Sequence, residues 1–437
     1  MTAALAPATP VLTPRAAPGS VWPASTRSSP DGDLTVGGVS LTELAERYGT
    51  PVYVIDEGEF RGRARAWRRA LPDADVVYTA RAFLSRAVVD WAEQEGLGLV
   101  VCSAGELELA ATRGFPADRI VLHGDATSPR DLRTALRIGV GRIVLDAPGE
   151  IARLAAAATG PEPQQVMVRV RTGALPGAGE SGFTVADGSA LEAVGRVLGQ
   201  PCLQLVGIHT CLGTSVASPE PYAFAVRRLV SFLAAVRDRY GVTLPELDLG
   251  GGFAVPYLPG DPAPAPAAYG RRIEDTLIRA CAAHDYPRPR LTVEPGRSLM
   301  APAGVALYRV LSVSRGATGA WVTVDGGMSD NPRPALYGAR YAVRMVGRHS
   351  DAPARATTVV GRHGETGDVL AESVELPEDL RPGDVLAVPV SGAYQVSMAS
   401  GYGMTGRPPV VAVAAGRPRL LLRRETFTDQ RGRDVGL

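Results

Sequence analysis

The chain of 437 residues contains no lysine, because all 46 residues counted as Lys plus Arg are arginines. Lysine is ordinarily among the commonest residues. A GC-rich genome would favour arginine codons, and the many alanine, glycine and proline residues agree with that explanation. The absence still has a chemical consequence, since a lysine amine is the side chain that forms Schiff bases with carbonyl compounds. The sequence excludes every reaction that needs such a side chain.

Other absences narrow the class of protein. Cys102, Cys202, Cys211 and Cys281 form neither a CxxC pair nor a zinc-binding spacing. In a chain of this size we expect free thiols in a reducing cytoplasm. No stretch approaches 18 consecutive apolar residues, so no membrane-spanning helix is expected. The net charge of +1 and the lack of a long basic run predict no binding to nucleic acid or to anionic lipid.

The first 33 residues are rich in alanine, proline, threonine and serine. They lack a basic start followed by an apolar segment, so they do not match a secretion signal. Their composition predicts a disordered tail over residues 1–33. Together with the cysteine pattern, this favours a cytoplasmic protein.

Residues 51–307 alternate short apolar runs with amphipathic stretches of helical period. Segments 85–95 and 223–240 are examples of the predicted helices. The predicted strands are 76–78, 97–101, 119–122, 142–145, 166–170, 205–209, 247–249 and 291–294. Eight strands alternating with helices predict a parallel β/α barrel of the TIM type. An open doubly wound sheet is the alternative, which the lack of a GxGxxG motif after the first strand makes less favoured.

After residue 308 the pattern changes to short strand-like runs separated by turns, such as Pro382-Gly383-Asp384. The runs are 321–324, 357–360, 385–389 and 410–413. They predict a C-terminal antiparallel β domain over residues 308–437. Residues 34–50 are expected to join this domain, with a strand near 34–41.

Two predicted strand ends carry residues suited to binding. Gly250, Gly251 and Gly252 follow one strand, and three glycines let backbone amides approach an anion such as a phosphate. A simple tight turn is the alternative. The run from Glu294 to Arg297 follows another strand, where a carboxylate and a guanidinium could bind a protonated ring nitrogen and an anion. A surface ion pair is the alternative there. His123 and His284 have no patterned partner and are expected to be structural or exposed.

These motifs, with several others, resemble those of diaminopimelate decarboxylases of the actinobacterial type. The resemblance covers residues 34–426, nearly the whole chain. Its motifs are Gly250-Gly251-Gly252, Glu294-Pro295-Gly296-Arg297, Asp325-Gly326-Gly327-Met328-Ser329-Asp330-Asn331, Arg333, Ala335-Leu336-Tyr337-Gly338-Ala339 and Ser391-Gly392-Ala393-Tyr394. The resemblance implies a barrel with a β domain, pyridoxal phosphate as cofactor, and a head-to-tail homodimer with its sites at the interface.

The resemblance also implies a role for each matching residue. One set of residues would bind the cofactor, by contacting its phosphate, its ring nitrogen or other atoms of it. The residues that match these cofactor roles are Gly250, Gly251, Gly252, Thr214, Glu294, Gly296, Arg297 and Tyr394. The substrate's carboxylates and distal amine would be held by a second set, with Glu365 supplied across the dimer. The residues that match these substrate roles are Arg297, Arg333, Tyr337, Glu365 and Tyr394.

The chain departs from the family at three positions that carry the chemistry. Arg81, in Tyr78-Thr79-Ala80-Arg81-Ala82, stands where the family has the lysine that binds the cofactor covalently. An arginine is always protonated and cannot replace that amine. Cys211 stands where a histidine stacks on the cofactor ring. Gly364 stands where a cysteine donates a proton after carbon dioxide leaves. A segment at 180–182 also departs from the family's Lys-Phe-Gly.

The losses suggest that binding persists while the ordinary chemistry does not. The main hypothesis is a divergent enzyme acting on an amino acid, with pyridoxal phosphate bound non-covalently or absent. A second hypothesis is a pseudoenzyme that senses an amino acid or pairs with an active homologue as a heterodimer. The third is ordinary decarboxylation of meso-diaminopimelate in lysine biosynthesis, which the missing lysine opposes.

Overall fold

The computed structural model describes residues 20–175, 181–316 and 319–436. Two compact units divide the chain. The first contains residues 1–60, 256–261 and 301–437, and the second contains residues 61–255 and 262–300. Among the described residues, no helix is both long and apolar enough to cross a membrane. Residues 1–19 of the predicted tail lie outside the described part.

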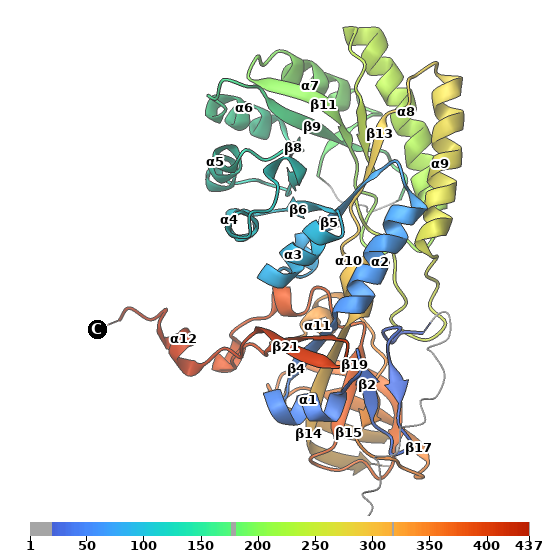
Figure 1. The fold of residues 1–437 in the computed structure, drawn as a ribbon, viewed down its shortest axis with the longest axis vertical. Helices are drawn as coiled ribbons and strands as arrows, with labels where there is room; N and C mark the ends of the chain where they lie inside the picture. The colour runs from blue at the N-terminus through green and yellow to red at the C-terminus, as the bar shows by residue number, and fades with distance from the viewer. Residues whose placement is uncertain (1–19, 176–180, 317–318, 437) are drawn as a thin grey trace, which may run out of the picture. The chain divides into compact units, whose positions relative to one another are not determined.

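The second unit is a closed barrel of eight parallel strands, as predicted (Figure 1). The barrel closes because β13 pairs with β5 and β8 pairs with β9. The strands are β5 (Asp75–Thr79), β6 (Gly98–Val101), β7 (Ile120–Leu122), β8 (Arg142–Leu145), β9 (Gln164–Arg171), β11 (Leu203–His209), β12 (Glu246–Asp248) and β13 (Arg290–Val293). Each of the eight predicted runs therefore became a barrel strand.

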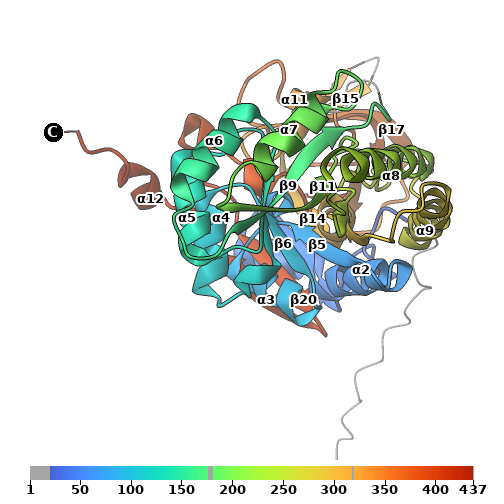
Figure 2. The same ribbon diagram turned by 90° about the horizontal axis from the view of Figure 1, so that it is seen from above.

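Helices surround the barrel strands, as Figure 2 shows. They are α2 (Glu57–Ala70), α3 (Arg86–Gln94), α4 (Ala104–Thr112), α5 (Pro129–Ile138), α6 (Pro148–Ala157), α7 (Ser189–Leu198), α8 (Glu220–Tyr240), α9 (Pro266–Ala283) and the short α10 (Arg297–Met300). Ser85, Ser103 and Ser128 begin α3, α4 and α5 by accepting a backbone N–H bond in the first turn. Buried side chains from six barrel strands pack into one hydrophobic cluster: Val77, Val100, Val121, Val144, Met167 and Val206.

The first unit is built on a nine-stranded sheet. Its main path runs β18-β17-β15-β14-β4-β20-β21, and β19 pairs with β14 and with β16. The strands are β4 (Val52–Asp56), β14 (Gly304–Gly316), β15 (Gly319–Val324), β16 (Arg344–Val346), β17 (Ala354–Val360), β18 (Val369–Pro377), β19 (Val385–Pro389), β20 (Val410–Ala414) and β21 (Arg417–Leu422). The helices α1 (Leu41–Tyr48), α11 (Arg333–Tyr337) and α12 (Phe427–Arg431) belong to this unit.

Three features of this unit differ from the prediction. The sheet is mixed, because β4 pairs parallel with β20 and β15 pairs parallel with β17. β4 lies in this sheet and not in the barrel, since its buried residues pair with β14 and β20. The predicted tail ends earlier than residue 33, because β1 (Arg27–Ser28) pairs with β2 (Leu34–Val36).

Residues near 34–41 form β2 and β3 (Val39–Ser40) in a separate three-stranded sheet with β1. The sequence predicted a strand here, but not a second sheet. Leu34, Val36 and Val39 pack into one core with Val54 and Val411 of the larger sheet. Shared burial of these apolar side chains explains why the segment joins the first unit.

Candidate functional site

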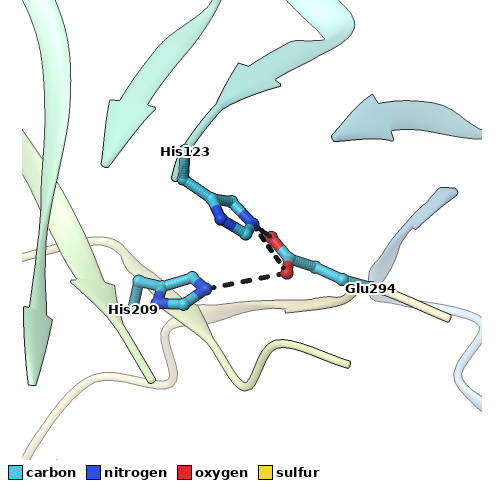
Figure 3. Close-up of side chains that lie close together, drawn as sticks. All are labelled: His123, His209 and Glu294. Carbon is cyan, nitrogen blue, oxygen red and sulfur yellow. Dashed lines mark hydrogen bonds and ion pairs between the residues drawn. The ribbon is translucent and has the colours of Figure 1, made fainter. Parts of the chain in front are cut away.

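Three side chains at the carboxyl ends of barrel strands meet in a buried cluster (Figure 3). His123 follows β7, His209 ends β11, and Glu294 follows β13. The Nε2 atom of His123 lies 3.1 and 3.0 Å from the two carboxylate oxygens of Glu294. Nε2 of His209 lies 3.6 Å from the Oε2 atom of Glu294. The three side chains are 5%, 0% and 4% exposed, so water hardly screens their interactions.

Arg169 of β9 contacts the opposite side of both imidazole rings. Its Nη2 atom lies 2.8 Å from Nδ1 of His123, and its Nε donates to Nδ1 of His209 at 3.3 Å. Its Nη1 donates to Asp125 at 2.7 Å and to Asp146 at 3.5 Å. The Arg169 side chain is 6% exposed, so the two histidines and the two aspartates take the place of water around its guanidinium.

The charges of the cluster follow from this geometry. Burial alone raises the pKa of Glu294, but the electrostatic and hydrogen-bond interactions of the carboxylate with His123 and His209 outweigh it and hold that pKa well below its ordinary value. Burial, with Arg169 and His123 nearby, lowers the pKa of His209 to about 4 despite the opposing effect of Glu294. At neutral pH the site therefore contains an ionised Glu294 and a neutral His209.

Two more acids lie at the carboxyl ends of other barrel strands. Asp248 ends β12 and accepts a hydrogen bond from the amide of Gly250 at 2.8 Å. Burial and the charge of Glu294 raise the pKa of Asp248 well above its ordinary value. Asp146 accepts a hydrogen bond from Ser181 at 2.6 Å. Burial, together with Glu150, raises the pKa of Asp146 to about 7. Both acids hold protons more tightly than ordinary carboxyl groups do.

The cluster has the composition of a metal site. The ligand atoms of His123, His209 and Glu294 all lie within 4.8 Å of one another. Two histidines and one carboxylate are a ligand set that zinc accepts. A metal binds only a ring nitrogen that carries no proton, so the protonation of the two rings decides whether such an ion could bind.

The glycine loop after β12 is closely packed against other backbone. Gly250 and Gly252 have φ values of 67° and 95°, which favour glycine. A Cβ at Gly250 would collide with the carbonyl oxygen of Thr210, and one at Gly252 with that of Gly213. A Cβ at Gly251 would lie 2.6 Å from the carbonyl oxygen of Glu294. The loop's own packing therefore requires small residues, and a phosphate-binding role for it stays a prediction.

The other predicted residues of the barrel lie in the same loops. Arg81 is exposed and follows β5 in a short helical turn. Cys211 and Thr214 are exposed after β11. Arg297 is half-buried and its Nε donates to the carbonyl oxygen of Thr214 at 3.1 Å, which links two of the predicted positions. Gly296 is buried, and a Cβ there would lie 2.8 Å from the Cβ of Thr79.

In the first unit, Arg333 is held between two tyrosines. It lies at the start of α11 and is 7% exposed. Its Nη1 donates to the hydroxyl oxygen of Tyr257 at 2.9 Å and also to that of Tyr341. Its Cζ lies 4.9 and 5.8 Å from the two ring centres. Among the described residues, no carboxylate pairs with this guanidinium, although a buried cation ordinarily needs one.

The remaining predicted residues are more exposed. Tyr337 is 66% exposed at the end of α11. Glu365 is exposed and accepts a hydrogen bond from Tyr402. Gly364 has a φ of 69° and no atom within 4 Å of an added Cβ. Tyr394 is half-buried with a φ of 62°, an uncommon conformation for a residue with a side chain. The cofactor and substrate roles of all these residues stay predictions.

Sequence reasoning missed His123 and Arg169. The sequence predicted His123 to be structural or exposed; the residue is not exposed, because it is buried against Glu294. Its position directly after a predicted strand was a usable signal, because active sites of barrels gather at those strand ends. Arg169 lies within a strand, and nothing in the sequence pattern distinguishes it from an arginine that faces solvent.

The comparisons with known proteins define the class first. Residues 57–301 match the family model described as the pyridoxal binding domain of pyridoxal-dependent decarboxylases. The fold and this match place the chain among pyridoxal-dependent decarboxylases with a β/α barrel and a second β domain.

The particular family follows from the relatives. The chain is 52% identical to a diaminopimelate decarboxylase of Actinosynnema pretiosum, over 95% of each chain. It is 42% identical to that of Mycobacterium tuberculosis, over 94% of this chain and 96% of the relative. The crystal structure of diaminopimelate decarboxylase from M. jannaschii in complex with L-lysine is 26% identical and matches with a TM-score of 0.87, covering 95% of this chain and 98% of that one. The chain belongs to the diaminopimelate decarboxylase family.

Proposed function

We propose that this chain binds an amino acid that carries a carboxylate and acts on it without a lysine-anchored pyridoxal phosphate. The observation that carries the proposal is Arg333, a buried guanidinium with two tyrosine contacts and no acidic partner among the described residues. Because an unpaired buried charge is costly, a ligand carboxylate would stabilise this position. The family's substrate role for this position supports the same assignment.

The residues do not fit the anchored cofactor of the family. No lysine exists in the chain, and Arg81 stands at the position of the amine. An arginine side chain cannot act as that nucleophile at neutral pH. Both oxygens of Glu294 already lie within hydrogen-bond distance of His123. We therefore assign no chemical step to the cofactor, and any pyridoxal phosphate would be held non-covalently.

The chain's own residues can bind and position a ligand. Arg333 supplies a cation whose direction the two tyrosines fix. Glu294 supplies a buried negative charge, which His123 stabilises. Asp146, whose pKa is about 7, and Asp248, whose pKa burial and the charge of Glu294 raise well above its ordinary value, could donate protons. The first unit thus offers a cation to a ligand, and the second unit offers a buried carboxylate and two acids that can carry protons.

Decarboxylation of diaminopimelate is the second candidate. The 52% identity to a named diaminopimelate decarboxylase over nearly the whole chain favours it. The absent lysine and the glycine at position 364 oppose it. The sequence resemblance also predicts a homodimer, and the cysteine usage and N-terminal composition predict a cytoplasmic location; both stay predictions, as does pairing with an active homologue.

Calorimetric titration with meso-diaminopimelate and with L-lysine, paired with a carbon dioxide release assay in added pyridoxal phosphate, separates the candidates. We expect wild-type protein to bind at least one amino acid and to release no carbon dioxide. Arg333→Met should weaken binding by about 10- to 100-fold, since it removes a charge-assisted hydrogen bond worth about 1.5–3 kcal/mol. Arg340→Met, at an exposed arginine of the same unit, is the matched control.

Each outcome decides between the hypotheses. Carbon dioxide release from diaminopimelate by pure wild-type protein would establish the second candidate and overturn the first. Equal binding by wild-type protein and Arg333→Met would remove the observation on which the proposal rests. Binding of neither amino acid, combined with tight association with an active homologue, would favour the pseudoenzyme.

A further inference from the structure

We infer that Arg169 is a positioning residue that fixes the proton positions of His123 and His209 and thereby keeps the cluster from binding a metal ion. The inference concerns the barrel cluster alone and does not depend on the proposed function. It rests on four contacts that form a closed ring: Arg169 with each histidine on one side, and Glu294 with each histidine on the other.

Arg169 sets the direction of the hydrogen bonds that it makes with the two rings. A guanidinium has only donors and does not lose its proton in proteins. The Nδ1 atoms of His123 and His209, at 2.8 and 3.3 Å from it, must therefore be acceptors without a proton. A neutral imidazole carries one proton, which is then on Nε2 in each ring. Both Nε2–H groups point toward Glu294, at 3.0 and 3.6 Å.

The same proton positions oppose metal binding. The nitrogens that face Glu294 are the ones a metal would need, and each carries a proton. A histidine that binds metal through Nε2 ordinarily donates its Nδ1–H to a carboxylate or carbonyl. Here the Arg169 guanidinium faces both Nδ1 atoms. A proton moved to either Nδ1 would therefore face an N–H group of Arg169. A metal cation would also be repelled by the buried charge of Arg169.

The neighbours of Arg169 fix its orientation. Nη1 donates to Asp125 at 2.7 Å and to Asp146 at 3.5 Å, while Nε and Nη2 face the two histidines. A planar fork can bond in these directions at once, whereas a lysine ammonium is a single point charge. The barrel cluster is thus built for an arginine, and His123 and His209 serve as N–H donors toward Glu294.

The first test measures the proton positions directly in the full-length wild-type protein. With 15N-labelled histidine, a two-bond 1H–15N spectrum distinguishes an imidazole protonated at Nε2 from one protonated at Nδ1. The chain has five histidines, and the two signals are assigned by their loss in His123→Gln and His209→Gln. We expect both rings to show a proton on Nε2 at pH 7.5. A proton on Nδ1 of either ring would overturn the inference.

The second test asks whether removing Arg169 creates a metal site. Arg169→Met should bind Co2+ at a single site, seen by visible absorbance, about 10- to 100-fold more tightly than wild-type protein, the range by which outer-shell partners change metal affinity. Arg171→Met, at an exposed arginine on the same strand, should behave as wild type. The inference fails if wild-type protein binds Co2+ through His123 and His209, or if Arg169→Met gains no affinity.

If Arg169→Met does not fold, Arg169→Lys replaces it, because it keeps the charge but lacks the planar fork that faces both rings at once. That variant is expected to lose the fixed Nε2–H pattern in the two-bond spectrum. An unchanged pattern in folded Arg169→Lys would show that Arg169 does not set the proton positions. The spectrum of wild-type protein decides the proton positions in either case.

Discussion

At the scale of single residues, position 81 offers a test of whether a lysine placed there would react with pyridoxal phosphate. It is exposed after β5, at the position where the family has its lysine. Replacement of one residue by lysine gives the chain its only side-chain amine, so an adduct on any internal residue must form there. Labelling of the Arg81→Lys variant is therefore not obscured by other lysines.

We expect Arg81→Lys to form one borohydride-stable pyridoxal phosphate adduct per chain at position 81, and wild-type protein to form none at an internal residue. Only a placed lysine near Glu294 and the glycine loop should react efficiently. Peptide mass spectrometry after reduction locates the adduct. Arg86→Lys, at an exposed arginine nearby, is the control. Equal labelling of the two variants would contradict a preserved cofactor site.

His209 makes stability depend on pH. Its pKa falls from 6.5 to about 4 on folding, mainly through burial. As the pH falls below 6.5 the unfolded chain binds a proton before the folded one does, so stability is lost between about pH 6.5 and 4. The full shift corresponds to about 3 kcal/mol. Asp146 acts in the opposite direction, because its raised pKa of about 7 lets the folded protein bind a proton first as the pH falls.

We therefore expect His209→Gln to lose less unfolding free energy than wild-type protein between pH 7 and pH 4.5, by about 2–3 kcal/mol. The comparison cancels the opposing contribution of Asp146, which both proteins contain. Urea unfolding at the two pH values gives the difference. His349→Gln, at an exposed histidine, is the control and should follow wild type. Parallel losses in His209→Gln and wild type would contradict the low pKa of His209.

At the scale of elements, loops position the first unit's predicted residues. Asp368 joins the loop after β15 to the loop after β17: its Oδ1 accepts from the amide of Met328 at 2.6 Å, and its Oδ2 from that of His363 at 2.9 Å. The second loop also carries Gly364 and Glu365. Asp368 is 2% exposed, so water cannot easily replace its carboxylate.

Asp368→Ala should lower the unfolding free energy by about 1–3 kcal/mol, because the two amides lose a charged acceptor. Chemical denaturation measures the loss. Asp351→Ala, whose side chain is 95% exposed, is the matched control and should change stability by less than about 0.5 kcal/mol. A loss no larger than that of the control would mean that Asp368 does not hold the two loops together.

At the scale of the whole molecule, the missing lysine limits the chain to one primary amine, the N-terminus. An amine-reactive succinimidyl ester should therefore add a single group at neutral pH, in both folded and urea-denatured protein. Intact-mass measurement counts the groups added. Two or more stable adducts per chain in the denatured protein would show that another side chain reacts under these conditions. The same protein can serve in the cofactor experiments without competing surface amines.

The barrel was predictable in detail, whereas the second sheet was predictable only in part. Barrel strands are buried on both faces, so they appear in the sequence as apolar runs of the right length. β4 is such a run too, and its apolar pattern alone did not reveal that it pairs with β14 and β20. The parallel pairs in the mixed sheet join segments far apart in the chain, and local patterns contain no record of such partners.

Sequence by itself determined the family, the eight barrel strands and the absence of an amine at position 81, because each follows from residue identity and local order. Only the tertiary structure decided what surrounds Glu294. His123, Arg169 and His209 come from three different strands, and their contacts depend on how those strands close into a barrel. A lysine's absence is visible in any listing of the residues, but the proton positions of two histidines depend on atoms that only folding brings within 4 Å.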